Sequence, residues 1–500
     1  MKQAKLFASN HFIVGEINEN LFGSFVEHMG RTIYTGIYEP THPSADEDGF
    51  RSDTLEAVKG LGLKNIRYPG GNFVSCYNWK DGVGKERIPR LEIAWGATEP
   101  NTFGLNEFMK FAEKVNVMPI IAVNLGTRGI EDAMSLVEYC NHSGGTYYSD
   151  LRIEHGITEP YNIATWCLGN EMDGPWQIGH KTATEYGRLA EECAKAMKRV
   201  DPRIKLVSCG SSLSSMSTYP DWELTTLGHT YDYIDYISLH QYYGGQDKGT
   251  PEFLSQSENM DKYIRTVAAV CNVIKEKKRS DRDIYISFDE WNVWNFPSVK
   301  EPDAAEKWQV APRTSEMIYT FEDMLLFSSM MLVLLRNCDR VKIACQSLLT
   351  NVSATIMTVP GGECWLQPTY YPFSHIAKYA KGKVLNTNLI CPTYASENGE
   401  IPYLDVICVQ DPDNKELVIF AVNRSLTDDF NLEVDLYGLH PKTIQHQVKM
   451  KSDDIKANNL ENHKRIVPAY DDKKIAVNEQ CELPIPKFSW NVFRIQYDQA

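Results

Sequence analysis

The sequence predicts an α/β fold: a (β/α)8 TIM barrel followed by a C-terminal antiparallel β-sandwich of jelly-roll type. Two observations lead to this prediction. Eight short apolar runs with strand character alternate with helical patterns between residues 21 and 349, which is the element order of a closed parallel barrel. After residue 385 the helical patterns stop, and alternating strand patterns separated by Asn, Asp, Gly and Pro follow, as in a sandwich.

The eight predicted barrel strands are apolar through their bodies, because a parallel strand is covered on both faces. They are LFGSFVEH from Leu21, LKNIRYPGG from Leu63, VMPIIAVNLG from Val117, NIATWCLGNE from Asn162, IKLVSCGSS from Ile204, YIDYISLHQYY from Tyr233, DIYISFDEWN from Asp283 and VKIACQSLL from Val341. A doubly wound open sheet is the competing fold. It would usually carry a Gly-rich phosphate turn after its first strand, and FGSFVEHMG does not fit that pattern.

Helices are predicted between these strands from their apolar periodicity. The clearest cover residues 52–62, with Ser52 as the cap, and residues 104–116, 182–202, 259–278 and 314–337. The last contains the longest apolar stretch of the chain, MLLFSSMMLVLLRN from Met324. Two serines interrupt that stretch and it is too short to span a bilayer, so a buried helix is expected.

The sandwich is predicted from five alternating segments. They are YLDVICVQ, ELVIFAVNRS, FNLEVDLYGL, HQVKMKS and FSWNVFRIQY, and the first 18 residues of the chain also read as strands that can join them. Because 500 residues exceed one ordinary core, two domains are expected. We predict a catalytic barrel over residues 19–384 and a sandwich built from residues 1–18 and 385–500.

Composition excludes several classes of partner. The net charge of −15 argues against nucleic acid or an anionic membrane as the main partner. The first residues contain neither a continuous apolar segment nor a small-residue cleavage site, so a cytoplasmic protein is expected. The twelve cysteines form no CxxC pair and many lie in apolar runs, which indicates buried free thiols.

Polar residues close the predicted barrel strands, at the end of the barrel where active sites lie. Two carboxylates stand out, Glu171 after the fourth strand and Glu290 on the seventh, and only a closed barrel would bring them together. Two carboxylates in one cleft can divide the work of breaking a glycosidic bond between a nucleophile and an acid/base. The other strand-end residues are Glu27, His28, Arg67, Asn72, Asn170, His240, Gln241, Tyr242 and Asp289.

The surroundings of the two carboxylates fit this chemistry. Their mutual repulsion should raise the pKa of one, while Arg67 and His240 keep the other ionised. Tryptophans in the adjacent loops can pack against the apolar faces of a sugar; they are Trp95, Trp176, Trp291 and Trp294. Taken singly, a glutamate after a strand is more often a surface cap, and Glu27 with Arg67 can be a structural salt bridge. The combination of strand-end groups favours a site.

No cofactor or metal is predicted. The sequence contains no Ser–His–Asp order, no Walker-type loop, no HExxH helix and no dinucleotide fingerprint. His180, His229 and His375 lack partners at ligand spacing and are interpreted as structural.

Longer motifs resemble a known family. GSFVEHMGRTIYTGIYEP, IRYPGGNFVSCYNWKDGVG, WCLGNEMDGPWQIGHKTATEYGRLA, YISLHQYYG and SFDEWNVW together are similar to the family 51 glycoside hydrolases, and more closely to the intracellular bacterial α-L-arabinofuranosidases. The resemblance runs through nearly the whole barrel to YYPFSHIAKYAKG, whereas the sandwich matches only in texture.

The resemblance implies a retaining mechanism with Glu171 as acid/base and Glu290 as nucleophile. It implies a furanose pocket lined by residues matching Glu27, Arg67, Asn72, Trp95, Asn170, His240 and Tyr242. In that scheme Asn170 holds the 2-hydroxyl, and Glu27 and Asn72 bind hydroxyls further round the ring. Family members are often hexamers and need no cofactor.

One segment departs from the family. After the last barrel strand the family usually reads AQLVNVIAP, and its glutamine contributes to the sugar site, whereas this chain reads CQSLLTNVSAT. With Asn351 as the anchor, the glutamine position is Leu348. Gln346 lies two residues earlier, on the same face of an extended strand, and is the candidate substitute with a different reach.

The hypothesis is therefore an exo-acting α-L-arabinofuranosidase that removes terminal non-reducing arabinofuranose from arabino- and arabinoxylo-oligosaccharides. Two alternatives remain open. One is an endo-glucanase or β-xylosidase of the same family, with an open cleft. The other is a sugar-binding barrel without catalysis.

Overall fold

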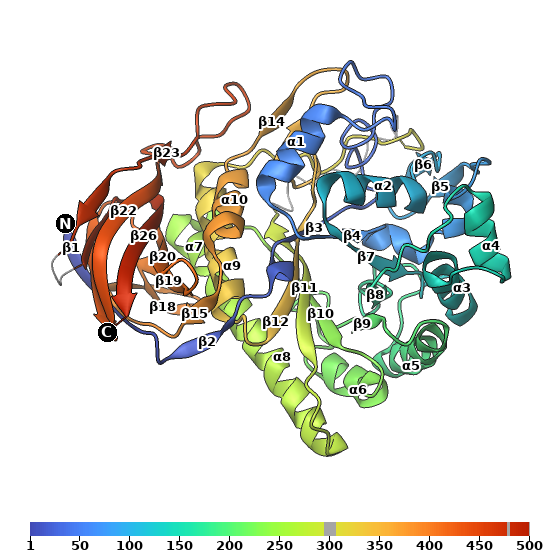
Figure 1. The fold of residues 1–500 in the computed structure, drawn as a ribbon, viewed down its shortest axis with the longest axis horizontal. Helices are drawn as coiled ribbons and strands as arrows, with labels where there is room; N and C mark the ends of the chain where they lie inside the picture. Colours follow the sequence, from blue (N-terminus) through green and yellow to red (C-terminus); the bar gives the residue numbers. More distant parts are fainter. Residues whose placement is uncertain (295–306, 478–480, 500) are drawn as a thin grey trace.

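The computed structural model describes residues 1–294, 307–477 and 481–499, and its larger part is a closed barrel of eight parallel strands (Figure 1). Each strand pairs with the next in sequence, and the last pairs with the first, so the ring closes. The strands are β3 (Gly23–Phe25), β4 (Asn65–Tyr68), β7 (Met118–Val123), β8 (Thr165–Leu168), β9 (Lys205–Ser208), β10 (Tyr236–Tyr243), β11 (Tyr285–Val293) and β12 (Val341–Ser347). Seven lie inside the predicted runs, and β11 extends one residue past its run to Val293, so the barrel prediction is confirmed.

Helices surround this ring and bury their apolar faces against it. They are α1 (Ser52–Leu61), α2 (Leu105–Val115), α3 (Ile130–Asn141), α4 (Tyr147–Glu154), α5 (Ala183–Val200), α6 (Asp221–Thr230), α7 (Thr250–Ser255), α8 (Ser257–Lys278), α9 (Phe321–Arg336) and α10 (Tyr370–Tyr379). Short loop hairpins lie outside the barrel sheet, β5 (Arg90–Glu92) with β6 (Ala97–Glu99) and β13 (Ile356–Thr358) with β14 (Cys364–Leu366).

Two helix starts differ from the prediction. Ser52 is the first helical residue of α1 rather than its cap, because the preceding Arg51 occupies the N-cap position. The helix predicted from Thr314 begins only at Phe321, after irregular chain. There Thr320 and Asp323 form a capping box, which satisfies amide groups at the first turn and fixes the start.

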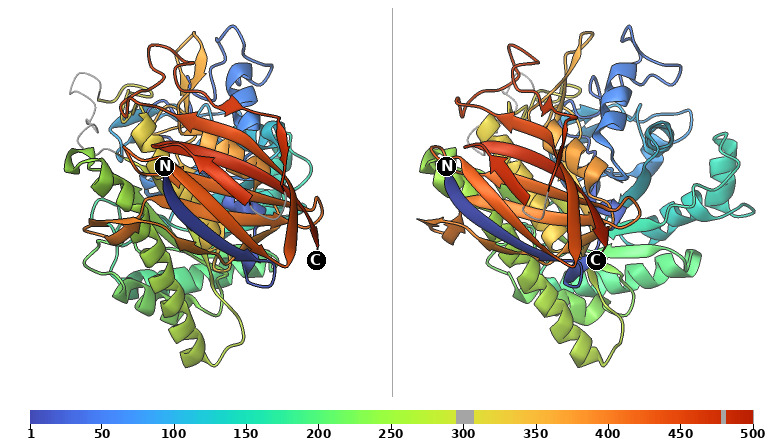
Figure 2. Two further views of the ribbon diagram at one scale, coloured as in Figure 1. Left: turned by 90° about the vertical axis from the view of Figure 1, so that its left-hand side faces the viewer. Right: turned by 60° about the vertical axis from the view of Figure 1, so that its left-hand side comes forward.

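The second part is a two-sheet β-sandwich (Figure 2). One sheet has the order β16 (Asn388–Ile390), β1 (Lys2–Ser9), β21 (Phe430–Tyr437), β25 (Cys481–Ile485). The other has the order β2 (Ile13–Glu16), β15 (Lys383–Leu385), β19 (Leu404–Asp411), β20 (Glu416–Asn423), β26 (Ser489–Gln499), β22 (Leu439–Lys451), β23 (Ala469–Tyr470), with β24 (Lys474–Ala476) also on β22. A small hairpin, β17 (Thr393–Ser396) with β18 (Gly399–Pro402), stands apart.

The N-terminal strand belongs to the sandwich, although the rest of that unit follows the barrel. Strand β1 lies between β16 and β21 and pairs with β21 in parallel, from Lys2 opposite Phe430 to Ser9 opposite Tyr437. The other neighbouring strands of the sandwich pair antiparallel. The pairing of β1 with β21 supports our proposal of a sandwich unit made of two separate stretches, residues 1–18 and 385–500, although strand β15 (Lys383–Leu385) spans the proposed boundary at 384/385.

Helix α9 fills the space between the barrel and the sandwich (Figure 1). Every residue from Phe321 to Leu335 is buried, which explains why this helix is apolar all round. It packs against β11 on one side and β19, β20 and β26 on the other.

None of the helices in the described ranges is both long and apolar enough to cross a membrane. The twelve cysteines are all unpaired and most are buried, as predicted.

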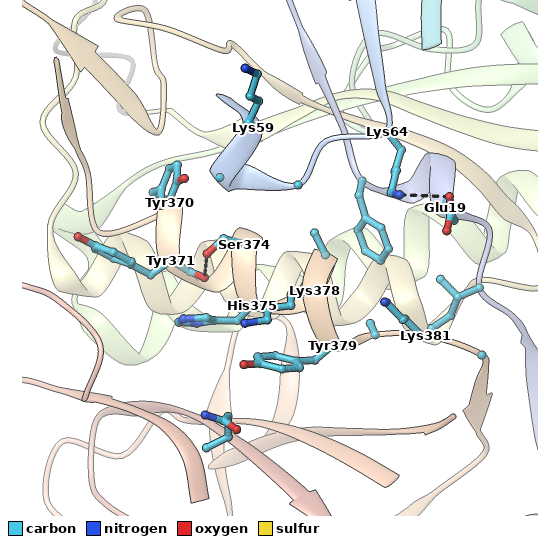
Figure 3. A pocket seen from close by; sticks show the side chains of 18 of the residues that line it. Glu19, Lys59, Lys64, Tyr370, Tyr371, Ser374, His375, Lys378, Tyr379 and Lys381 are labelled. Atoms are coloured by element: carbon cyan, nitrogen blue, oxygen red, sulfur yellow. Dashed lines mark hydrogen bonds and ion pairs between the residues drawn. The ribbon is translucent and has the colours of Figure 1, made fainter. Parts of the chain in front are cut away.

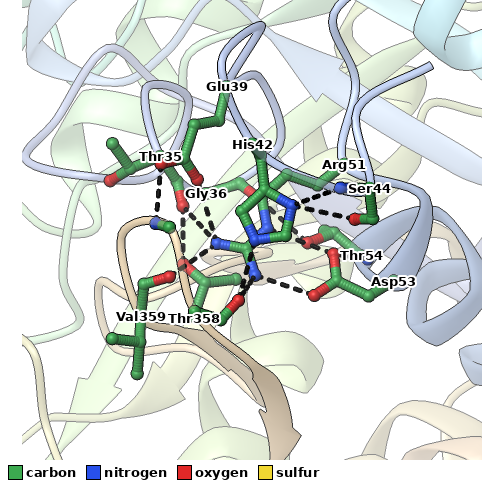
Figure 4. A network of polar contacts seen from close by, with 12 residues as sticks. Thr35, Gly36, Glu39, His42, Ser44, Arg51, Asp53, Thr54, Thr358 and Val359 are labelled. Carbon is green, nitrogen blue, oxygen red and sulfur yellow. Dashed lines mark hydrogen bonds and ion pairs between the residues drawn. The ribbon is translucent and has the colours of Figure 1, made fainter.

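A buried arginine ties the loop after β3 to the β13–β14 hairpin (Figure 4). Arg51 is fully buried and forms ion pairs with Glu39 at 3.1 Å and Asp53 at 2.7 Å. Its guanidinium also donates to the carbonyl oxygens of Val359 at 2.8 Å and Gly362 at 2.6 Å. The planar guanidinium group of Arg51 thus pairs with two carboxylates and also donates to two carbonyl oxygens of the hairpin.

Replacing this arginine should destabilise the fold strongly. In Arg51→Met the buried carboxylate of Glu39 and the half-buried carboxylate of Asp53 lose their cation, and we expect the free energy of unfolding to fall by about 3–5 kcal/mol. Urea unfolding followed by circular dichroism measures the loss. The matched control is Arg265→Met, because Arg265 is 64% exposed and its pair with Asp261 is a surface ion pair worth about 0–1 kcal/mol. Equal losses of unfolding free energy in the two variants would contradict this structural role of Arg51.

Candidate active site

The barrel gathers the predicted catalytic residues at the carboxyl ends of its strands. Glu171 follows β8 after a tight turn in which Gly169 has φ +87° and Glu171 itself φ +45°. The left-handed backbone of a glutamate is sparsely populated, and such strain is typical of functional positions. Glu290 lies on β11 directly opposite His240 of β10 in the parallel register. Two glutamates that are distant in the sequence therefore face the same hollow.

Glu171, His240 and Glu290 form one compact cluster. One nitrogen or oxygen atom from each lies within 4.8 Å of the others. His240 Nδ1 is 3.0 Å from Glu171 Oε1 and 3.6 Å from Glu290 Oε2. The sequence prediction that a closed barrel would bring these two carboxylates together agrees with this geometry.

The two glutamates have different partners. Glu290 accepts hydrogen bonds from Arg67 Nη1 at 2.7 Å and from the Tyr242 hydroxyl at 2.8 Å. Glu171 accepts one from the indole Nε1 of Trp176 at 2.7 Å. An arginine and a phenol suit a carboxylate that must remain an electron-pair donor, whereas the described part of the chain gives Glu171 no arginine as a hydrogen-bond partner.

The pKa of Glu171 is raised. Burial is the main cause, and the negative charge of Glu290 adds to it, while His240 and Trp176 oppose it through hydrogen bonds. The sequence predicted repulsion as the cause of such a shift, but burial contributes more. A carboxyl group with a raised pKa can hold a proton at neutral pH and deliver it.

Asp289 supports the cluster from below, a role that the sequence reasoning did not assign. It is fully buried and accepts from His240 Nε2 at 2.9 Å and from the Ser287 hydroxyl at 3.0 Å. Burial raises the pKa of Asp289, but Arg67 and His240 outweigh that effect and lower it. Burial lowers the pKa of His240, but Glu290, Asp289 and Glu171 together raise it to about 10. The sequence signal that could have indicated this role is the position of Asp289 directly before Glu290 at the end of one strand.

Glu27 forms the opposite side of the site. Its Oε1 accepts from the backbone amide of Phe73 and from the indole Nε1 of Trp95, both at 2.9 Å. Burial raises the pKa of Glu27 to about 8, against the opposing effect of the Phe73 amide. The PGG turn passes so close that a Cβ on Gly71 would lie 2.7 Å from the Glu27 carboxyl carbon. The two glycines are therefore needed for the turn to approach the carboxylate.

A cavity of about 280 Å³ connects these groups. Eight predicted residues line it, namely Glu27, Asn72, Trp95, Glu171, Trp176, Tyr242, Glu290 and Trp294, whereas Trp291, which was expected beside them, does not. Three others, Arg67, Asn170 and His240, are buried and do not line it: Arg67 and His240 bond directly to its carboxylates, and Asn170 accepts a hydrogen bond from Arg67 Nη2 at 2.6 Å. The sequence reasoning gave no role to four lining residues: Met29, Gly71 and Leu213 come from irregular segments, and Ser347 is the last residue of β12.

Leu348, not Gln346, meets the cavity. Gln346 is fully buried within the barrel, where its side-chain amide donates to the Ser353 carbonyl at 3.4 Å. The expectation that Gln346 could take the place of the family glutamine is therefore wrong. Strand β12 ends at Ser347, so the alternation of an extended strand no longer relates residues 346 and 348. This wall of the cavity is apolar in this chain.

The cluster also has the composition of a metal site, but its hydrogen bonding argues otherwise. Glu171, His240 and Glu290 are the group of three acidic or histidine ligands found among the described residues. Both ring nitrogens of His240 point at carboxylates, and a pKa of about 10 keeps both protonated. With both ring nitrogens facing carboxylates at hydrogen-bond distance, the arrangement suits proton transfer.

Comparison with known proteins gives, over nearly the whole chain, the family that the sequence motifs resemble. Residues 57–268 match the α-L-arabinofuranosidase 1 domain, and residues 289–489 match the α-L-arabinofuranosidase C-terminal domain. The chain is 48% identical to the intracellular exo-α-(1→5)-L-arabinofuranosidase of Acetivibrio thermocellus, covering 99% of this chain and 100% of that protein. It is 49% identical to intracellular exo-α-(1→5)-L-arabinofuranosidase 1 of Bacillus subtilis, covering 99% of each.

A solved structure is similarly close. A family 51 α-L-arabinofuranosidase from Bifidobacterium longum superposes with a TM-score of 0.95 at 39% identity, covering 99% of this chain and 100% of that one. The barrel, the sandwich and their order in the sequence are thus shared with proteins of one enzyme family.

Proposed function

The chain belongs to the α-L-arabinofuranosidases of glycoside hydrolase family 51, and from this premise we propose that it releases terminal non-reducing arabinofuranose from arabino- and arabinoxylo-oligosaccharides by a retaining mechanism. The observation that carries the proposal is the pair of unlike glutamates in one small cavity. Glu290 is the nucleophile, and Glu171 is the acid/base.

The reaction has two displacements. In the first, a Glu290 oxygen attacks the anomeric carbon, the bond to the leaving oxygen breaks, and Glu171 gives that oxygen its proton. In the second, the ionised Glu171 takes a proton from water, whose oxygen attacks the anomeric carbon and displaces Glu290. Arg67 and Tyr242, bonded to the two oxygens of Glu290, hold this carboxylate in place for the attack.

The distance between the two acids supports retention. Their nearest ligand oxygens lie within 4.8 Å of each other. Retaining glycosidases separate the two carboxyl groups by about 5–5.5 Å, whereas inverting enzymes leave about 6.5–9.5 Å for a water molecule. This short separation supports the proposal of a retaining rather than an inverting arrangement.

The remaining residues are suited to holding one pentose. A cavity of about 280 Å³ is the size of a single sugar rather than of a polymer groove, which favours exo action over an endo-glucanase. Asn170 donates nothing from its buried side-chain nitrogen within the described residues, so this amide is available to a hydroxyl close to Glu290. Glu27, Asn72 and Trp95 bind the far side of the ring, as the family resemblance implies.

The experiment is a substrate panel combined with a stereochemical assay. The protein is incubated with the 4-nitrophenyl α-L-arabinofuranoside, β-D-xylopyranoside and β-D-glucopyranoside, and early products are observed by ¹H NMR. We expect turnover of the first substrate in large excess, with α-arabinofuranose as the first anomer formed. Preference for xyloside or glucoside would support the endo-glucanase or β-xylosidase alternative. No turnover of any would support a sugar-binding barrel.

The raised pKa of Glu171 predicts the alkaline side of the pH profile. Deprotonation of this acid ends proton donation, so kcat/KM on an oligosaccharide should fall on the alkaline side at a higher pH than for an ordinary glutamic acid. Because the His240 hydrogen bond opposes the shift, His240→Asn should move this alkaline limb to higher pH. The control is His180→Asn, an exposed histidine, which should leave the limb in place. A limb that moves down in His240→Asn would refute the assignment.

Location and assembly are part of the proposal. The relatives named above are called intracellular, and we place this enzyme in the cytoplasm, where short oligosaccharides are the accessible substrates.

We further propose a hexamer, on the family resemblance alone. Light scattering coupled to size-exclusion chromatography tests this, and a mass near that of one 56.9 kDa chain would exclude it.

A further inference from the structure

A second and larger cavity lies between the barrel and the sandwich (Figure 3). Its volume is about 940 Å³, and its walls come from the α1–β4 loop, helix α10, the segment after it and the edge of the sandwich. Gly62 and Lys64, which precede β4, line it, so it opens near the amino ends of the barrel strands. The catalytic glutamates follow the carboxyl ends, so the two cavities lie at opposite ends of the barrel.

Lysines gather in this second cavity although the chain carries a net charge of −15. Four line it, Lys59, Lys64, Lys378 and Lys381, against the three carboxylates Glu16, Glu19 and Asp472. Glu19 is already paired with Lys64 at 3.4 Å, and Lys59 is paired with Glu56 at 3.0 Å. Lys378 and Lys381 form no ion pair with any described residue, and Lys378 only lies over the Tyr379 ring at 5.0 Å. Two ammonium groups are therefore left for a ligand.

A fixed hydrogen-bond chain supplies a third donor. Trp490 Nε1 lies 3.2 Å from His375 Nδ1, and because an indole nitrogen only donates, Nδ1 must accept. Burial, aided by Lys378, lowers the pKa of His375 to about 3, so the ring is neutral and its proton resides on Nε2. Nε2 lies 3.2 Å from the Tyr470 oxygen and donates to it. The hydroxyl proton of Tyr470, whose residue is 59% exposed, is left to point at a ligand.

We propose that this cavity, bounded by Lys378, Lys381 and Tyr470, binds a sugar-sized anion that carries a carboxylate or a phosphate group. The three unengaged groups are all donors, so they select an acceptor-rich ligand. The half-buried ring of Tyr371, which lines the same cavity, offers an apolar face on which a sugar can pack. The shared chemistry has two sources, a uronic acid and a sugar phosphate.

The test is isothermal titration of the full-length protein with D-glucuronate, with D-glucose 6-phosphate and with neutral D-glucose. We expect saturable binding of at least one anion at millimolar concentration and none of glucose. Binding should weaken about tenfold or more in Lys378→Gln/Lys381→Gln, because both charged donors are lost. Tyr470→Phe should weaken it several-fold, because only the hydroxyl donor is removed. Whether glucuronate or glucose 6-phosphate binds shows whether the natural ligand is a uronic acid or a sugar phosphate.

The matched control is Lys262→Gln/Lys277→Gln, which removes two exposed lysines of α8 and should leave binding unchanged. Turnover of 4-nitrophenyl α-L-arabinofuranoside without anion should equal that of the unmodified protein in all three variants. Three results would overturn the proposal: no saturable anion binding, equal affinity in the Lys378/Lys381 variant, or equal binding of glucose. Failure of arabinofuranosidase activity would instead count against the proposed function, because the second cavity is assayed by binding alone.

Discussion

Glu290→Gln is expected to lower kcat on 4-nitrophenyl α-L-arabinofuranoside by about 10⁴-fold or more, a typical loss when a group that forms the covalent intermediate is removed. An amide has nearly the same shape and can still meet Arg67 and Tyr242, so the fold and the cavity should persist. What disappears is the electron pair that attacks the anomeric carbon. Steady-state kinetics measures the loss, and an unchanged thermal unfolding midpoint shows that the protein remains folded.

The control for this substitution is Glu276→Gln on the exposed side of α8, which makes the same chemical change without loss of activity. Added azide should partly restore turnover in Glu290→Ala, where it can enter the space left by the carboxylate and attack directly, and the arabinosyl azide should have the β configuration, because one displacement inverts the anomeric centre. Retention of more than a hundredth of the original kcat would show that Glu290 is not the nucleophile.

Glu171→Ala should produce a different pattern of loss. With an oligosaccharide, whose leaving oxygen needs a proton, we expect kcat/KM to fall by about 10³-fold or more, within the range that general acid catalysis supplies together with positioning. With the 4-nitrophenyl substrate, whose leaving group departs without protonation, the first displacement should be far less affected. The second step then limits the rate, the arabinosyl enzyme accumulates, and KM falls together with kcat.

Azide should accelerate Glu171→Ala, because an external anion can enter the space left by the carboxyl group and attack the arabinosyl enzyme. The product should be the α-arabinosyl azide, since two displacements retain the configuration. Glu171→Gln is the matched control: it also lacks the acid/base but fills the space, so azide should help it much less. Absence of rescue in Glu171→Ala, or a β product, would refute the role of Glu171.

The barrel was predictable because its strands are short apolar runs that end in polar residues. Glu171 and Glu290 could be assigned from the sequence since parallel strands in a closed ring must end at one rim. Arg67, Asn170 and His240 were also found this way, but only the structure shows that Arg67 and His240 bond to the catalytic carboxylates from beneath the cavity wall and that Asn170 is held by Arg67.

Features that depend on chain path rather than on local pattern were not predictable. Leu348 lines the cavity and Gln346 does not, because the strand ends between them. The alternation of side chains along a strand does not extend past that point. Met29 and Leu213 reach the cavity from irregular loops, whose course is set by tertiary packing. The parallel pairing of β1 with β21 joins residues more than 400 positions apart, and no local signal specifies such a partner.

That pairing has a consequence for the order of events during synthesis. The first strand leaves the ribosome long before Phe430–Tyr437 exists, so its edges remain unpaired while the whole barrel is made. The barrel can close first, and the N-terminal strand must then be captured late by its distant partner. Shortening the chain by its first nine residues should therefore leave nascent barrel formation intact and impair the last step of maturation.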